Sequence, residues 1–140
     1  MKKLVILTLT LLLSTQAFAG QKAKVVKNGE IYDLLHSACA SLEMEVCPTL
    51  YRHYNIEAIA QAGVLKKSGK SIIIVNPSKF RSSAKTTSAK KAVIAHELSH
   101  VLVKEKTGNN SRHHGGDYKK ECKSIVEALE LSPTACKSSM

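Results

Sequence analysis

Apolar residues recur at helical spacing in three segments of this chain. The segments run from Ile31 to about Met44, from about residue 88 to about residue 106, and from Tyr118 to Leu131. Their apolar positions are Ile31, Leu34, Leu35, Ala38 and Leu42 in the first, Ala92, Val93, Leu98, Val101 and Leu102 in the second, and Tyr118, Cys122, Ile125, Val126 and Leu129 in the third. Residues three and four apart share one face of a helix, so each segment predicts a helix with a buried stripe.

Two further segments indicate extended structure. Residues 71–75 form a β-branched run, Ser-Ile-Ile-Ile-Val, which follows a turn at residues 67–70 and ends at Asn76-Pro77. The segment from Tyr54 to Leu65 is ambiguous, because its apolar residues fit both a strand and a helix. This mixture of elements within residues 20–140 predicts one small α+β domain with a single core.

The first 19 residues have the pattern of a secretory signal peptide. Two lysines precede an apolar run from Leu4 to Leu13, and the segment ends with an Ala-x-Ala sequence at Ala19. We therefore predict cleavage after Ala19 and a periplasmic or secreted mature protein, residues 20–140. The apolar run is too short to cross a bilayer, which disfavours the alternative of a retained membrane anchor.

Cysteine usage agrees with export. Residues 20–140 contain four cysteines, and in an oxidising compartment this even number predicts two disulfides, with three alternative connectivities. We favour Cys39–Cys47 and Cys122–Cys136, because each pair closes a local loop beside a helix end. A zinc site built from cysteines is the alternative, but no Cys-x-x-Cys pair is present to support it.

The chain is basic, which bears on its partners. Its formal net charge of +10 becomes +8 without Lys2 and Lys3 of the signal segment. Such a charge favours anionic partners, for example nucleic acid or components of the cell envelope. The lysines are dispersed, however, and few aromatic residues are available to stack on bases. A solvated surface is the simpler interpretation, and nucleic-acid binding is kept as an alternative.

The candidate chemistry lies in the second predicted helix, where residues 96–100 read His-Glu-Leu-Ser-His. On a helix, His96 and His100 lie on one face and can bind one metal ion, while Glu97 can reach a metal-bound water. Burying these three polar groups in an apolar helix would be costly without a metal. The pattern therefore predicts a zinc-peptidase centre, and an amphipathic helix with two surface histidines is the alternative.

A second element downstream makes this interpretation more specific. Residues 114–118 read His-Gly-Gly-Asp-Tyr. The two elements together resemble the signature of the SprT-like (Spartan-type) metallopeptidase family, which is H-E-x-x-H on a helix, then a loop, then His-Gly-x-x-aromatic. The resemblance begins at Ala62-Gly63, includes the Asn76-Pro77 pair after the β-branched run, and extends to about Leu129, which is more than half of residues 20–140.

The resemblance implies a fold and a set of site residues. It implies a zincin-like domain in which the active-site helix packs on a short antiparallel sheet with flanking helices, and it favours a strand for residues 54–65. One zinc ion would be bound by His96, His100 and His114, with Glu97 as the general base. Zincins place a strand beside the active helix, where its edge can pair with an extended substrate, and we expect residues 72–75 to play this role.

The third metal ligand has rivals in the same region. They are His113, Asp117, Glu121 and Glu127. We favour His114, because Gly115 gives the backbone the freedom to turn the preceding side chain inward. Asp117 is expected instead to N-cap the helix that begins at Tyr118. Candidates for stabilising an oxyanion, named only by proximity, are Arg112, His113 and Tyr118.

Two functional classes follow from the sequence. The first is a secreted or periplasmic zinc endopeptidase, a monomer that hydrolyses protein or peptide substrates through a water activated by zinc and by Glu97. The second is a non-enzymatic, zinc-stabilised module that binds an anionic partner. The glutamate favours the enzyme, because a structural zinc site has no need of it.

Overall fold

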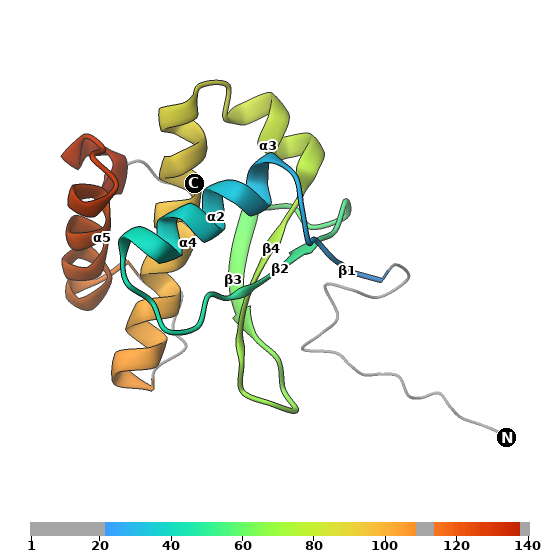
Figure 1. Ribbon diagram of the computed structural model, residues 1–140, viewed down its shortest axis with the longest axis horizontal. Coiled ribbons are helices and arrows are strands. Elements are labelled where there is room, and N and C mark those ends of the chain that lie inside the picture. The colour runs from blue at the N-terminus through green and yellow to red at the C-terminus, as the bar shows by residue number, and fades with distance from the viewer. Residues whose placement is uncertain (1–21, 109–113, 138–140) are drawn as a thin grey trace, which may run out of the picture.

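A β-branched strand lies at the centre of a four-stranded sheet, and a long helix packs against that sheet (Figure 1). The computed structural model describes residues 22–108 and 114–137. Its elements are β1 (Lys24–Val25), α2 (Glu30–Ser41), β2 (Thr49–Arg52), β3 (Ala60–Val64), β4 (Ser71–Val75), α3 (Pro77–Ser83), α4 (Thr87–Thr107), α5 (Gly116–Ala128) and the 3-10 helix η2 (Pro133–Cys136). The predicted α+β class is confirmed, and the predicted signal segment lies outside the described residues.

The sheet is mixed, with strand order β1-β2-β4-β3. A turn through Gly69, whose φ is 71°, joins β3 to β4 and makes them antiparallel, whereas β2 pairs with β4 in parallel. The prediction of an antiparallel sheet is therefore wrong in part, because the chain crosses from one side of β4 to the other between β2 and β3. The prediction that residues 72–75 offer a free edge is also wrong, since β4 pairs on both sides and the edge strands are β1 and β3.

Both faces of β4 are buried, which explains its unbroken apolar sequence. Ile73 and Val75 belong to the main core with residues of the helices. Ile72 and Ile74 point to the opposite face, where they pack with Ile56 in a smaller cluster. This second cluster accounts for the apolar Ile56, which is buried without lying in a strand, and only residues 60–64 of the predicted extended segment pair in the sheet.

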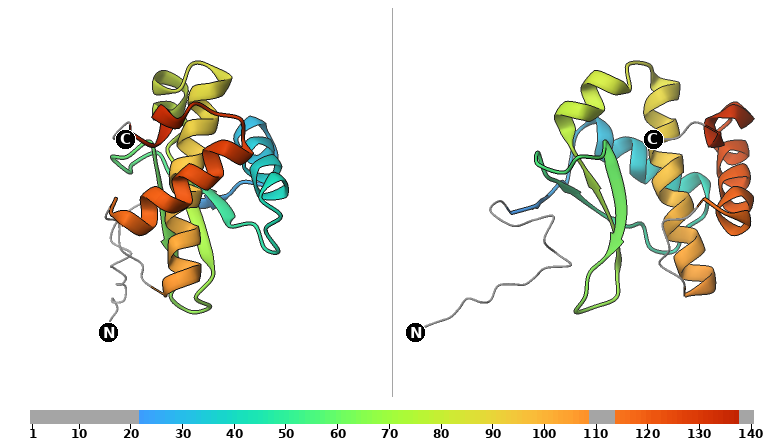
Figure 2. Two further views of the ribbon diagram at one scale, coloured as in Figure 1. Left: turned by 90° about the vertical axis from the view of Figure 1, so that its left-hand side faces the viewer. Right: turned by 180° about the vertical axis from the view of Figure 1, so that it is seen from behind.

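The long helix α4 stands between the sheet and α5 (Figures 1 and 2). It begins after Thr86, whose hydroxyl accepts a hydrogen bond from the Ala89 amide, and it ends at Gly108 with a φ of 74°. Its bounds agree with the predicted residues 88–106 within one residue at each end. Because neighbours cover it on several sides, even His96, Glu97 and Ser99 of its middle turns are buried.

The other two predicted helices are present with shifted ends. The first begins at Glu30 and ends at Ser41, with Leu42 as its C-cap, and the last begins at Gly116 and ends at Ala128. Asp117 therefore lies inside the first turn of α5, and Gly115 is the N-cap, so the prediction that Asp117 caps the helix is wrong. The helix thus begins two residues before the predicted Tyr118, and the Asp117 carboxylate in its first turn still interacts favourably with the positive end of the helix dipole.

Two disulfides fasten helices to the segments that follow them. Cys39 of α2 is bonded to Cys47, and Cys122 of α5 is bonded to Cys136 of η2, the two pairs favoured from the sequence. Each bond closes a short loop and limits the conformations of the unfolded chain. In the part of the chain that the structure describes, no helix has the length and apolar character needed to cross a lipid bilayer.

Asn76 is the polar centre that joins the sheet to α3. Its side chain is 2% exposed, and its amide nitrogen donates to the Tyr54 and Ile56 carbonyls at 2.9 and 3.0 Å. Its amide oxygen accepts from the backbone N–H groups of Ser78 and Lys79 and so caps α3. One residue thereby fixes the end of β4, the start of α3 and the crossover loop.

We predict that Asn76→Ala lowers the free energy of unfolding by about 2–4 kcal/mol, since it removes a cap and leaves two buried carbonyls unpaired. Asn76→Asp should be comparably destabilising, because it keeps the cap but turns an oxygen toward those carbonyls. Urea denaturation of the metal-free protein measures both effects. The control is Ser82→Ala, an exposed change in α3, which should stay within about 0.5 kcal/mol. An unaffected Asn76→Ala variant would contradict this role.

Candidate metal centre

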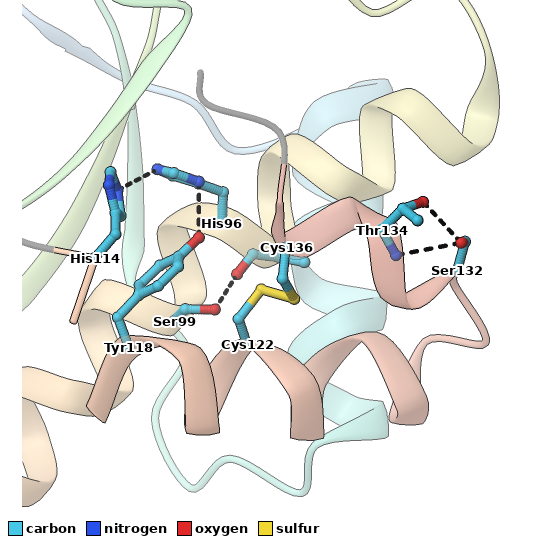
Figure 3. The surroundings of a disulfide bond; sticks show 9 residues. His96, Ser99, His114, Tyr118, Cys122, Ser132, Thr134 and Cys136 are labelled. Atoms are coloured by element: carbon cyan, nitrogen blue, oxygen red, sulfur yellow. Dashed lines mark hydrogen bonds between the residues drawn. A yellow bond between two sulfur atoms is a disulfide. The ribbon is translucent and has the colours of Figure 1, made fainter. Parts of the chain in front are cut away.

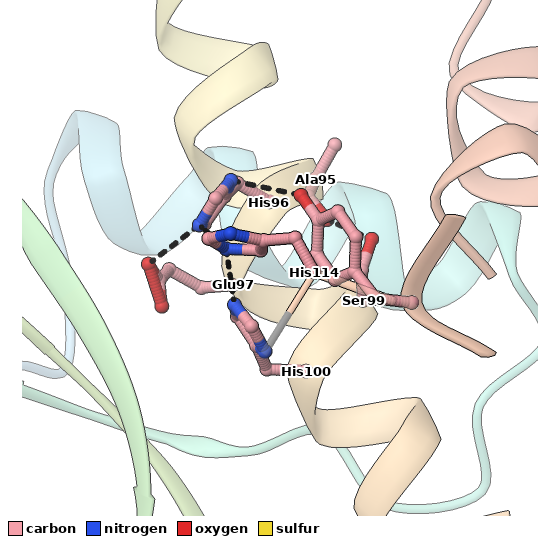
Figure 4. Close-up of polar contacts among 7 residues, drawn as sticks. Ala95, His96, Glu97, Ser99, His100 and His114 are labelled. Atoms are coloured by element: carbon pink, nitrogen blue, oxygen red, sulfur yellow. Dashed lines mark hydrogen bonds and ion pairs between the residues drawn. The ribbon is translucent and has the colours of Figure 1, made fainter. Parts of the chain in front are cut away.

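Three histidine side chains converge on one point above the middle of α4 (Figure 4). The His114 Nε2 atom lies 3.2 Å from His100 Nε2 and 3.3 Å from His96 Nε2. Within the described ranges, these three residues are the group of side chains that could hold a metal ion. The structure thus brings together the three residues that the sequence predicted as ligands.

Each histidine reaches this point for a local reason. His96 and His100 are one helical turn apart on α4, so their side chains share a face. His114 lies two residues before α5, which packs along α4 through Tyr118, Cys122 and Ile125. The docking of α5 therefore brings the start of that helix, and the histidine before it, over the middle of α4.

Tyr118 holds the most buried histidine in place. Its hydroxyl lies 2.8 Å from His96 Nδ1, on the far side of the ring from the point of convergence (Figure 3). If Nδ1–H donates to the hydroxyl oxygen, the lone pair of Nε2 is directed at the other two imidazoles. This is the tautomer that a metal ligand requires, and such outer partners fix the ligand's orientation.

The environment keeps both of these groups uncharged near neutral pH. Burial, reinforced by the neighbouring His100 and His114, lowers the pKa of His96 to about 4. Burial, together with the charge of Glu97, raises the pKa of Tyr118 to about 12. His96 is therefore a neutral imidazole, the form that binds metals, and Tyr118 remains a phenol that can accept a hydrogen bond through its oxygen.

Glu97 places a buried carboxylate next to this cluster. It is 5% exposed, and its Oε1 atom lies 3.9 Å from His96 Nε2. A buried carboxylate is costly unless a cation or hydrogen-bond donors offset the lost hydration. Its position beside the converging nitrogens is the one that the H-E-x-x-H pattern predicts for a group acting next to a metal.

The spacing of the nitrogens fits a metal ion. Ligand nitrogens that bind zinc tetrahedrally at about 2.0–2.1 Å are separated from each other by about 3.3 Å. The separations of His114 Nε2 from the other two nitrogens, 3.2 and 3.3 Å, agree with that value, and all three ligand atoms lie within 4.8 Å of one another. Three neutral imidazoles suit zinc, and they also suit copper, nickel and iron, so the donor set alone does not fix which metal binds.

None of the rival ligands that the structure describes lies in the histidine cluster. The carboxylate of Glu121 is buried but accepts two hydrogen bonds from the Lys106 ammonium, at 2.7 and 3.0 Å. Asp117 and Glu127 are exposed on α5 and do not belong to the histidine group. His113 and Arg112 lie outside the described residues.

Comparisons of the chain with protein-family models, with curated proteins and with solved structures found no match. The proposed function therefore rests on the geometry of the site.

One element of that geometry is not predicted from the sequence. The sequence offers Tyr118 as an oxyanion partner, whereas the structure places its hydroxyl 2.8 Å from His96 Nδ1. The available signal is its position four residues after His114, which sets the tyrosine in the first turn of the helix that follows that histidine.

We predict that Tyr118→Phe weakens zinc binding by about 10–100-fold, because His96 loses the partner that fixes its tautomer and orientation. Competition with a chromogenic chelator at pH 7.5 measures the affinity. The matched control is Tyr32→Phe, at a tyrosine whose ring stacks on His36 in α2, and it should leave zinc affinity unchanged. Equal affinities of the Tyr118→Phe variant and the wild type would contradict the assigned hydrogen bond.

Proposed function

We propose that this protein is a zinc-dependent endopeptidase that acts in the periplasm or outside the cell. The observation that carries the proposal is a buried carboxylate, Glu97, next to three converging histidine nitrogens. When bound, zinc supplies a Lewis acid that polarises a carbonyl group and acidifies water. The resemblance to the SprT-like family, carried by H-E-x-x-H and the His-Gly-x-x-Tyr element, supports the same assignment.

The residues around the histidines favour catalysis over a structural role. Structural zinc sites are closed by four protein ligands, whereas catalytic sites have three and an open position. Here the described residues supply three, the four cysteines are bonded to each other, and His114 is exposed to solvent. A substrate could therefore approach the centre from the side of His114.

Glu97 and Tyr118 have separate tasks in this proposal. Glu97 accepts a proton from the attacking water and passes it to the leaving amine, for which its place beside His96 is suitable. Tyr118 keeps His96 in the tautomer whose Nε2 lone pair faces the centre. The substrate backbone would lie along β3, since β3 is an edge strand and packs against α4, whereas β4 is paired on both sides.

Export is the second part of the proposal. Both disulfides are of a kind that forms and persists in oxidising compartments. They agree with the signal-peptide pattern of residues 1–19. Described members of the SprT-like family are typically intracellular, so an exported chain would use the same chemistry on different substrates.

A binding module remains the second candidate, because a specific groove favours it. Lys22, Lys24 and Arg52 line a cavity of about 310 Å³ together with His53 and the half-exposed ring of Tyr54. Cations beside an aromatic ring suit an anionic partner, including single-stranded nucleic acid. In this alternative the metal would only stabilise the domain.

We predict that the exported, mature protein contains about one zinc ion per chain and that His114→Ala loses it, because a three-ligand site is reduced to two. Elemental analysis of the purified proteins gives the ratio. His36→Ala, which removes an exposed histidine of α2, is the control and should keep its zinc. A wild type without zinc would exclude the proposed centre, and unchanged zinc in His114→Ala would exclude His114 as a ligand.

We predict that Glu97→Gln retains zinc but lowers the rate of hydrolysis of unfolded casein by at least about 100-fold, since amide nitrogen and oxygen cannot accept the proton. The wild type should lose its activity in the presence of a chelator and regain it with zinc. A binding module would cleave nothing under any of these conditions. Full activity in Glu97→Gln would remove this residue from the role of base.

A further inference from the structure

A cavity of about 580 Å³ opens directly beside the candidate metal centre. One end is formed by His96, His114 and the Tyr118 ring, and the rest lies between α5 and η2. Its other lining residues are Lys119, Lys123, Val126, Glu127, Pro133, Cys136 and Lys137. The volume is within the range of pockets that bind small ligands, and larger than a single side chain needs.

The floor of this cavity is apolar and covalently fixed. Val126 is buried, and Pro133 and Cys136 of η2 form the opposite wall. Figure 3 shows Tyr118 and Cys122 pointing from α5 to the same side, where Cys122 is bonded to Cys136. The disulfide therefore holds the far wall in register with the histidine end.

The rim, in contrast, is cationic. Three exposed lysines line the cavity, namely Lys119, Lys123 and Lys137. The lining contains one carboxylate, that of Glu127. In the described part of the chain, no carboxylate lies within ion-pair distance of any of these three ammonium groups. Other lysines do have such partners, as Lys90 with Glu30 and Lys106 with Glu121 show.

We propose that this cavity is the substrate subsite next to the scissile bond and that it selects an apolar side chain adjacent to a carboxylate. The inference rests on the proposed peptidase function. The apolar floor would take the side chain, and the unpaired lysines would attract the carboxylate, which comes either from an acidic residue or from a free C-terminus. Such selection by charge depends on how well the positive potential of the rim complements the negative potential of the substrate.

The same features argue against a polyanion as the occupant. Recognition of phosphate commonly uses the planar, bidentate guanidinium of arginine, and this lining contains none. Tyr118, the one Phe, Tyr or Trp side chain of the lining, is 3% exposed and its ring lies at an angle against His96, which leaves little surface on which a base could stack. A single carboxylate beside an apolar group matches both the charge and the surface.

The test uses zinc-loaded Glu97→Gln protein and fluorescein-labelled octapeptides, so that binding is measured without cleavage. In the first pair, a central Phe is followed by Asp or by Asn, each with an amidated C-terminus, and the second pair ends at the Phe as a free acid or as an amide. We expect a carboxylate to tighten binding about fivefold in 50 mM salt and much less in 500 mM salt. The Asp pair and the C-terminal pair distinguish the two sources of the carboxylate.

A double variant locates the effect. Lys119→Gln with Lys123→Gln should reduce the preference for a carboxylate to about onefold, whereas Lys66→Gln with Lys67→Gln, the same change of charge in the β3–β4 turn, should retain it. Equal affinity for acidic and neutral peptides overturns the proposal. So does a preference that survives the Lys119 and Lys123 changes, or a labelled oligodeoxynucleotide that binds more tightly than every peptide and depends on the same lysines.

A separate measurement keeps the two proposals apart. Cleavage of the neutral Asn peptide by the wild type tests the peptidase function without reference to the lysines. Cleavage without any carboxylate preference would refute the subsite alone. A carboxylate preference in binding, with no cleavage of any peptide, would support a carboxylate-selective pocket, but it would refute the peptidase function and with it the role of this pocket beside a scissile bond.

Discussion

The packing of α5 along α4 is the contact on which the candidate site depends. It buries the face of α4 that carries His96, and it supplies both His114 and the hydroxyl that contacts His96 Nδ1. Without α5, His96 and His100 would be two solvated side chains on a helix, and the cavity beside them would lack one wall. The apolar stripe of α5, from Tyr118 to Val126, is therefore what converts a helical motif into a three-sided site.

That packing costs free energy, because it buries ionisable side chains in the middle of α4. His96 must stay neutral, and the carboxylate of Glu97 is 5% exposed, in a helix that is otherwise buried by apolar neighbours. Burial of a charged group costs several kcal/mol unless it is compensated. Sequences selected for stability alone would place leucine or alanine at these positions. The presence of an ionisable pair there is best explained by a function that needs it, and a bound cation would offset the cost.

The sequence predicted the parts of this structure that depend on local pattern. The α4 helix, the Ser71–Val75 strand and both disulfides agree with prediction because each follows from spacing within a short segment. The predictions that failed concern strands that pair with segments distant in the sequence. The strands β1 and β2 have two and four residues and no periodic signal, yet β2 determines that the sheet is mixed and that β4 has no free edge. At the site, the histidines were predictable from the motif, whereas the Tyr118 contact required the position of one helix against another.

The candidate metal centre and the lysine-rimmed cavity share α5, so they cannot vary independently. Tyr118 contacts His96 on one side and forms the cavity wall on the other, and Cys122, one turn further along, anchors the opposite wall through Cys136. A displacement of α5 would alter the orientation of a ligand and the shape of the cavity together. In an oxidising compartment the second disulfide limits such displacement, because η2 is held against the helix it flanks. The two disulfides are compatible with a secreted or periplasmic protein, and in such an oxidising compartment this arrangement of candidate centre and cavity is covalently fixed.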